Sequence, residues 1–132
     1  MFFARVDAEE KKQTFDTKSK VKVWRPSEQN FGSQKDILTI LMAQEQGQYC
    51  WPSGFAFDRN YQDYIFTDEK DKLFNAESKM IHLERVIKRM IDSDQSDHIF
   101  LMFGCDFSFT NANVNYAYLE RVVERWNHKY GG

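Results

Sequence analysis

The carboxylate of Asp106 is the side chain in this sequence best placed to do chemistry. It follows the apolar run HIFLMF at 98–103 and has phenylalanines on both sides. An aromatic surround that withdraws water favours the protonated carboxyl, and such a group can act as a general acid. The structural alternative is a capping role, in which the carboxylate accepts hydrogen bonds from backbone N–H groups of the next loop or helix.

Two further segments offer side chains that could bind a polar ligand. Arg5 lies between Ala4 and Val6 near the end of the apolar run FFARV, where its guanidinium either forms a surface salt bridge or clamps a ligand. The stretch 43–67 has no clear period, and irregular loops of this length are usually functional or disordered. Four aromatic residues stand close together in it: Tyr49, Trp51, Phe55 and Phe57. They form either a small separate core or a wall that stacks against sugars.

The histidines and cysteines show no spacing typical of a reactive or metal-binding site. His82, His98 and His128 are scattered, so the sequence predicts no zinc site built from this chain alone. Cys50 and Cys105 are too few for a disulfide framework and are expected to be buried thiols. No nucleophile elbow or phosphate-binding glycine loop is present in the sequence.

Composition narrows the protein class. The 132 residues suit one domain, and 42% hydrophobic with 29% charged residues is typical of a globular protein. A net charge of -2 argues against a nucleic-acid partner, which would need a basic surface. No apolar run is long enough to predict a membrane span. The start MFFARVDAEEKK does not fit a signal peptide, because acids follow the first apolar residues at once.

The elements that must position these side chains can be predicted from periodicity. Apolar or alternating runs predict strands at 2–6, 20–24, 37–42 and 98–103. Helices are expected at 7–13 after an Asp7 N-cap, at 67–94, and at 114–130. The strand and helix alternation of the second half favours a parallel sheet in an α/β fold. Ligands bind at the carboxyl ends of such strands, where Asp106 and Arg5 are expected to lie.

Four blocks of the sequence resemble one enzyme family. The segment FGCDFSFTNANVNYAYLERVVERWN at 103–127 is similar to the region around the acid/base aspartate of the class II α-mannosidases, glycoside hydrolase family thirty-eight, and most like the lysosomal branch. The blocks FFARVD at 2–7, VWRPSE at 23–28 and YCWPSGFAFD at 49–58 occur in the family's order and at similar spacings. The resemblance therefore extends over nearly the whole chain.

This resemblance implies a retaining α-mannosidase that uses two carboxylates and one zinc ion. Residues 1–132 would be the central part of its catalytic domain, a parallel seven-stranded β/α barrel that is incomplete in this chain. Asp106 matches the acid/base, which protonates the leaving oxygen and then deprotonates the attacking water. Arg5 matches an arginine that reaches the active-site carboxylates. Tyr49 matches a tyrosine that hydrogen-bonds sugar hydroxyls.

Parts of the family pattern are missing from the sequence. The nucleophile, an aspartate that also binds zinc, has no counterpart here, and neither do the other zinc ligands. Zinc ligands are therefore expected outside this chain and no metal ligand within it. Cys105 stands where relatives have a small polar or acidic residue. We expect an internal piece of a longer enzyme that is inactive alone.

The resemblance also sets expectations for partners and location. The partners would be a mannose-containing oligosaccharide and the remainder of the full-length enzyme, in a lysosome or vacuole. Two alternatives remain open at this point. One is a non-catalytic carbohydrate-binding domain in which the aromatic loop contacts the ligand, and the other is a degenerate relative that has lost activity.

Overall fold

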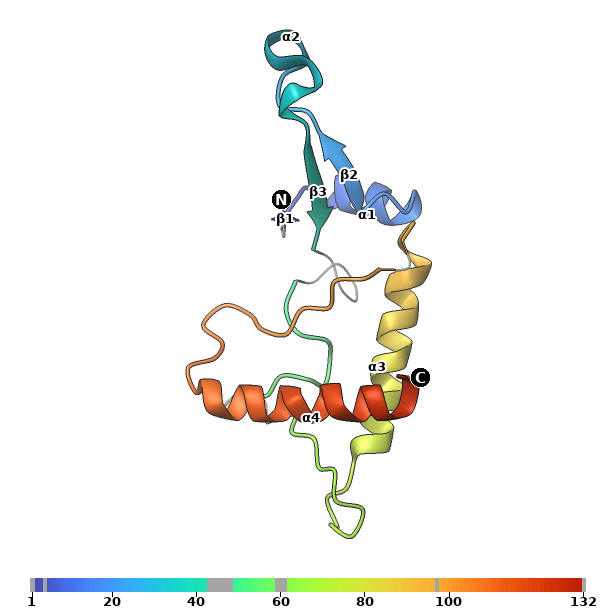
Figure 1. Cartoon of the computed structure of the whole chain (residues 1–132), viewed down its shortest axis with the longest axis vertical. Helices are drawn as coiled ribbons and strands as arrows, with labels where there is room; N and C mark the ends of the chain where they lie inside the picture. The colour runs from blue at the N-terminus through green and yellow to red at the C-terminus, as the bar shows by residue number, and fades with distance from the viewer. Residues whose placement is uncertain (1, 4, 43–48, 59–61, 97, 132) are drawn as a thin grey trace. The chain divides into compact units, whose positions relative to one another are not determined.

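The computed structural model describes residues 2–3, 5–42, 49–58, 62–96 and 98–131 (Figure 1). The chain forms two compact units. Unit 1 comprises Met1–Tyr49 and Arg89–Phe100, and unit 2 comprises Cys50–Lys88 and Leu101–Gly132. Each unit is described by itself below.

Unit 1 is built on a three-stranded sheet in the order β1-β3-β2. Strand β1 (Phe2–Phe3) pairs parallel with β3 (Ile37–Leu41), and β2 (Val21–Trp24) pairs antiparallel with β3. The short helix α2 (Glu28–Phe31) and the 3₁₀ helix η1 (Gly32–Lys35) connect β2 to β3 at the tip of this hairpin (Figure 1). The three strands predicted in the first third of the chain are therefore present, but β1 is shorter than the predicted strand at 2–6, since Arg5 and Val6 lie outside it.

The predicted N-cap at Asp7 is also confirmed. Helix α1 (Ala8–Asp16) begins directly after it, and one Asp7 carboxylate oxygen accepts hydrogen bonds from the backbone N–H groups of Glu9 and Glu10 at 2.9 and 3.4 Å. These donors have no partner inside the helix, so the cap fixes where the helix starts.

A buried lysine lies inside unit 1. The side chain of Lys20 is 3% exposed, and its ammonium donates to the carbonyl of Met90 at 3.2 Å and lies 3.5 Å from the Asp94 carboxylate. Burial lowers the pKa of Lys20 below its ordinary value, and the charge of Asp94 offsets part of this effect. Because a buried charge is costly without a partner, Asp94 is needed to hold this lysine in place.

An ion pair closes the connection between β2 and β3. Arg25 donates to both carboxylate oxygens of Asp36, from Nε at 2.8 Å and from Nη2 at 2.7 Å. These two hydrogen bonds lower the pKa of Asp36. Arg25 directly follows β2 and Asp36 directly precedes β3, so the pair fixes the two ends of the connecting segment.

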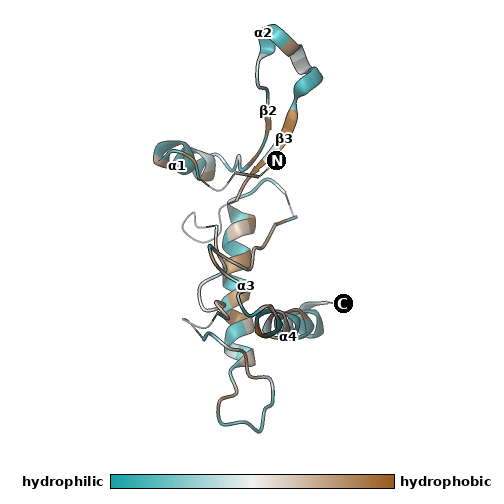
Figure 2. Cartoon of the chain, turned by 90° about the vertical axis from the view of Figure 1, so that its left-hand side faces the viewer, coloured by the Kyte–Doolittle hydropathy of each residue, from teal (hydrophilic) through white to brown (hydrophobic). Residues whose placement is uncertain are grey.

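Unit 2 packs around two long helices. The apolar positions of α3 (Ala76–Asp92) recur at helical spacing, and Figure 2 shows brown hydrophobic segments alternating with teal polar ones along it. Helix α4 (Ala112–Tyr130) runs across α3 in Figure 1 and is seen nearly end-on beside it in Figure 2. The buried core of unit 2 consists of Phe55, Phe57, Ile65, Ala76, Met80, Leu83 and Val122.

Helix α3 starts nine residues later than the predicted helix, at Ala76 rather than Thr67. Side chains before it capture the backbone in turns: Asp68 accepts from the N–H of Lys70, and Asp71 accepts from the N–H of Leu73, both at 2.9 Å. Such local side-chain hydrogen bonds compete with helix formation. The polar residues before Ala76 therefore form hydrogen-bonded turns in the segment predicted to be the start of the helix.

The strand predicted at 98–103 is wrong, because those residues form no strand in the structure. Phe100 is 56% exposed and contacts the ring of Phe2 at 5.2 Å, whereas Leu101 and Phe103 pack against the core of unit 2. A short apolar run indicates burial but does not by itself specify a strand. Here the side chains of Leu101 and Phe103 are partly buried without any pairing of their backbone in a sheet.

Helices and strands occur together, as expected for an α/β protein, but the sheet differs from the prediction. Within the described residues it is mixed rather than parallel, since β2 and β3 are antiparallel neighbours. In that same part of the chain, no helix is both long enough and apolar enough to cross a membrane.

Candidate functional site

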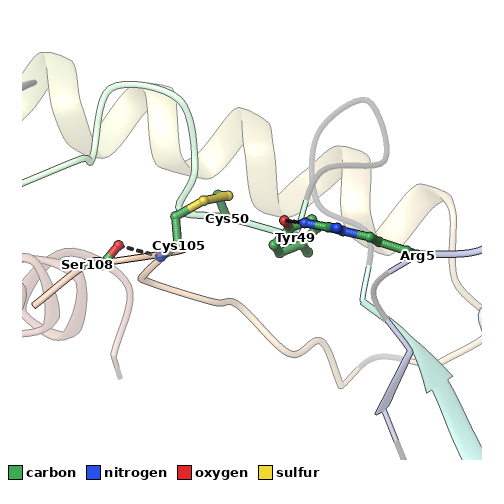
Figure 3. The surroundings of a disulfide bond; sticks show 5 residues. All are labelled: Arg5, Tyr49, Cys50, Cys105 and Ser108. Atoms are coloured by element: carbon green, nitrogen blue, oxygen red, sulfur yellow. Dashed lines mark hydrogen bonds between the residues drawn. A yellow bond between two sulfur atoms is a disulfide. The ribbon is translucent and has the colours of Figure 1, made fainter.

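Two of the three predicted site residues meet in unit 1. The guanidinium of Arg5 donates from Nη2 to the hydroxyl of Tyr49 at 2.5 Å, and its Cζ lies 5.3 Å from the centre of the tyrosine ring (Figure 3). Arg5 is exposed and Tyr49 is half-buried. Together they present a cationic donor and a phenol hydroxyl, which are groups that can hydrogen-bond the hydroxyls of a sugar.

The third predicted site residue, Asp106, lies in unit 2 on a tight turn between residue 104 and residue 109. The backbone N–H of Cys105 donates to Oγ of Ser108 at 2.6 Å (Figure 3), and the N–H of Ser108 donates back to the carbonyl of Cys105 at 3.0 Å. In the sequence, Asp106 lies between Cys105 and Ser108, the two residues that form these hydrogen bonds. Asp106 itself is exposed. Its carboxylate is therefore accessible at the tip of a closed turn.

The backbone of this turn is strained. Phe107 and Phe109 have φ values of 59° and 63°, in the left-handed region that side chains other than glycine rarely adopt. Each such residue costs on the order of 1 kcal/mol or more and persists only where its surroundings hold it. Phe109 is held by Asp58, whose carboxylate accepts from its N–H at 3.3 Å, and by ring contact with Tyr116 at 5.2 Å.

The expected aromatic enclosure of Asp106 is wrong for this chain. Phe107 is 96% exposed, and Phe103 turns into the core of unit 2, where its ring contacts Phe55 and Phe57. Phe103 and Phe107 therefore do not shield the carboxylate from water, and Asp106 is exposed. The structural reason is the left-handed turn, which separates the directions of neighbouring side chains.

The predicted buried thiols are also wrong, because Cys50 and Cys105 form a disulfide with their Cα atoms 4.6 Å apart (Figure 3). Their separation of 55 residues in the chain gives no local signal of pairing. Closing a loop of this length is expected to stabilise the fold by roughly 4 kcal/mol through the unfolded chain. One half-cystine directly precedes Asp106 and the other directly follows Tyr49.

The aromatic loop forms a core rather than an open wall at two of its four positions. Phe55 and Phe57 are buried, whereas Tyr49 and Trp51 are half-buried. Lys79 of α3 holds this loop by donating to the carbonyl of Gly54 at 2.5 Å and to that of Asp63 at 2.9 Å. Sequence reasoning missed this lysine, because nothing in its neighbours distinguishes it from the other lysines of a helix surface.

Helix α4 begins without a side-chain cap. Asn111 occupies its N-cap position but the side chain makes no capping hydrogen bond, and Asn113 lies within the helix. His82 is accounted for structurally, since its Nε2 lies 2.9 Å from the carbonyl of Ser53 and its ring stacks on Phe55. Among the residues that the structure describes, no three His, Cys, Asp or Glu side chains are grouped to hold a metal ion.

Comparison with known proteins identifies the family. The sequence profile of the glycosyl hydrolases family 38 N-terminal domain matches residues 1–132. A lysosomal alpha-mannosidase of Dictyostelium discoideum is 25% identical over 130 residues, which are 96% of this chain and 12% of that protein. Lysosomal alpha-mannosidases of Felis catus and Bos taurus are 23% and 24% identical over 128 and 127 residues, with the same two coverages.

The chain thus spans about 12% of the length of the curated relatives it matches. The resemblance read from the four sequence blocks is confirmed by the profile and by these relatives. The family profile matches every residue of the chain. The chain therefore belongs to the glycosyl hydrolases family 38, N-terminal domain.

Proposed function

We propose that this chain is part of a retaining α-mannosidase and carries its acid/base residue, Asp106. The observation that carries the proposal is the position of Asp106: an exposed carboxylate, on a turn closed by hydrogen bonds, within a chain of the family 38 N-terminal domain. Side chains that do chemistry must be both accessible and positioned; Asp106 is exposed, and hydrogen bonds close the turn that bears it.

In the proposed reaction Asp106 has two roles. As an acid, its carboxyl protonates the glycosidic oxygen while a second carboxylate attacks the sugar from the opposite side. As a base, the resulting carboxylate removes a proton from the water that releases the sugar. The attacking carboxylate belongs to the longer protein outside this chain.

Arg5 and Tyr49 have the binding role in this proposal. Their hydrogen-bonded pair carries N–H and O–H groups of the kind that hydrogen-bond the hydroxyls of a mannoside. The family implies a zinc ion that supplies a positive charge near the sugar. The described residues do not form a site for it, so its ligands are expected elsewhere in the longer protein and no step above depends on it.

The proposal extends to architecture and location. Residues 1–132 would be the central part of a seven-stranded β/α-barrel catalytic domain, and β1 and β2 at the two edges of the described sheet leave room for neighbouring strands. Lysosomal or vacuolar residence is supported by the names of the relatives. A disulfide agrees with that location, because disulfides persist outside the reducing cytosol.

The test uses the full-length protein with Asp106→Asn and two substrates, an α-linked mannose disaccharide and an aryl mannoside with a very good leaving group. Loss of a general acid should lower kcat for the disaccharide by about 10²- to 10⁴-fold. Formation of the glycosyl-enzyme from the aryl substrate should fall far less, because its leaving group needs no proton. Asp92→Asn, at an exposed position at the end of α3, is the matched control and should leave both rates unchanged.

Equal losses in the rate of glycosyl-enzyme formation with both substrates would contradict the acid role, and unchanged rates of both steps would remove Asp106 from the mechanism altogether. If the wild-type protein binds mannosides but does not turn them over, the chain instead belongs to a non-catalytic carbohydrate-binding protein or a degenerate relative. In that case truncation of Tyr49 or Trp51 should weaken binding, and Asp106→Asn should have little effect.

A further inference from the structure

We propose that the Cys50–Cys105 disulfide is a positioning device for Asp106, so that the catalytic rate depends on the oxidised state of this pair. The inference rests on the proposed acid/base role of Asp106. It assigns the two cysteines a role in holding the turn that bears the carboxylate, beyond their effect on overall stability.

The first argument is the place of the disulfide on the turn. Cys105 is the residue before Asp106, and its sulfur is bonded to Cys50 of the segment that leads to the buried Phe55. The turn closes through hydrogen bonds in both directions between Cys105 and Ser108. Cys105 therefore forms both the hydrogen bonds that close the turn and the disulfide that fixes it.

The second argument is that the contacts described on the other side of Asp106 are noncovalent and weaker than a disulfide. The N–H of Phe109 reaches the Asp58 carboxylate at 3.3 Å, and the Phe109 ring contacts Tyr116. Phe107, between these anchors, is 96% exposed and so contributes almost no packing. The covalent bond at Cys105 is the strongest restraint on the turn.

The third argument is the strained backbone that the restraint must maintain. Phe107 and Phe109, two of the three residues after Asp106, have φ near 60°. An unrestrained chain would return to negative φ values, which cost less energy. Residues 101 and 103 pack on the core of unit 2, so the chain enters the turn at a fixed place. Without the bond at Cys105, the turn is free to relax while that core stays folded.

The chemistry of release is a simple reduction. A small dithiol transfers two electrons and two protons: the S–S bond breaks, Cys50 and Cys105 become thiols, and the dithiol closes to its own disulfide. The carboxylate of Asp106 remains present, but the turn that carries it loses its covalent restraint. Because a misplacement of about 1 Å can cost on the order of a hundredfold in rate, turnover should fall while sugar binding persists.

The experiment compares the full-length wild-type protein, oxidised and treated with dithiothreitol, with a Cys50→Ser, Cys105→Ser double variant. Mass spectrometry of alkylated digests establishes whether this pair is reduced. We expect reduction to lower kcat for a mannose disaccharide by about ten- to a hundredfold, with KM changed less than about threefold. The double variant should resemble the reduced wild type and should not respond to dithiothreitol. Reoxidation should restore the wild-type rate.

A second measurement keeps the test independent of activity. Hydrogen–deuterium exchange of peptides covering 101–111 should rise on reduction, while exchange of peptides in α3 stays the same. Unchanged exchange in 101–111, an unchanged kcat in verified reduced protein, or loss of protection throughout unit 2 would each overturn the positioning role. The last result would mean that the disulfide serves the stability of the whole fold.

Failure of the proposed function gives a different pattern. If the oxidised wild type has no α-mannosidase activity, the acid/base assignment falls, and the exchange measurement alone decides whether the disulfide holds the turn. If kcat falls on reduction but Asp106→Asn has no effect, the disulfide positions a residue other than Asp106 and the inference is overturned.

Discussion

The guanidinium of Arg5 and the hydroxyl of Tyr49, which are 44 residues apart in the sequence, are joined by a hydrogen bond of 2.5 Å. The cation also lies over the tyrosine ring, at 5.3 Å from its centre. Each side chain thus fixes the orientation of the other, and a change in either one is expected to alter both.

This pairing predicts a shared effect on substrate binding. In the full-length protein, Tyr49→Phe removes the hydroxyl and should raise KM for a mannoside by about three- to tenfold, because one net hydrogen bond contributes about 1 kcal/mol. Arg5→Lys should have a similar effect, since lysine lacks the planar fork of donors. The double variant should lose less than the sum of the two, as measured by KM and by isothermal titration.

Tyr64→Phe is the matched control, because Tyr64 stacks on Tyr118 in unit 2 and takes no part in the proposed site. Its KM should equal that of the wild type. Full additivity of the Arg5 and Tyr49 substitutions would show that the hydrogen bond between them has no bearing on binding.

The buried pair of Lys20 and Asp94 predicts that losing one charge costs more than losing both. Asp94→Asn leaves the ammonium of Lys20 buried without its counter-charge and should destabilise unit 1 by about 3 kcal/mol. The double variant Lys20→Met, Asp94→Leu removes both charges and should cost less. Native-state hydrogen exchange of the β2 and β3 amides measures both. A larger loss in the double variant than in Asp94→Asn would contradict the argument.

The Arg25–Asp36 pair predicts a pH dependence in the segment that connects β2 and β3. The two hydrogen bonds from Arg25 lower the pKa of Asp36 below its ordinary value of 3.8. In the interval between the two pKa values the unfolded segment binds more protons than the folded one, so protonation favours opening. The stabilisation is therefore complete above pH 3.8 and is lost as pH falls through the folded pKa.

We expect the amides of 25–36 to exchange faster in Asp36→Asn than in the wild type at pH 5, and this difference should shrink as the pH falls below 3.8. Comparison at equal pH removes the intrinsic pH dependence of exchange. Glu28→Gln is the control, because Glu28 is more exposed and makes only a single contact of 3.3 Å with Arg25. A difference between wild type and Asp36→Asn that is independent of pH would contradict the assignment.

The surface of unit 1 predicts poor behaviour of the isolated 132 residues. Val23 and Leu38, on paired strands, are 61% and 59% exposed, and Trp24 and Phe31 are also exposed. Open strand edges and exposed apolar side chains favour association. We expect concentration-dependent aggregation by light scattering and no hydrolysis of mannosides. A sharp, cooperative melt of a monomer, or turnover by the pure chain, would contradict this prediction.

Much of the local structure follows from the sequence alone. The cap at Asp7, the alternating strands at the start of the chain, and the apolar stripes of α3 and α4 are encoded within a few residues of each other. These patterns depend on backbone hydrogen bonds and side-chain spacing between residues close in sequence. The sequence alone therefore predicts these elements correctly. The four family blocks likewise depend only on residue order, which is why they identified the family.

Only the tertiary structure decided which distant residues meet. The Cys50–Cys105 bond, the Arg5–Tyr49 hydrogen bond and the buried place of Lys20 join segments 44 to 70 residues apart. The apolar run at 98–103 shows the limit most clearly: its composition predicts burial, but a strand also requires a partner strand, and the partner is not written in the run itself. Hydrophobicity is a property of each residue, whereas pairing is a property of the folded chain.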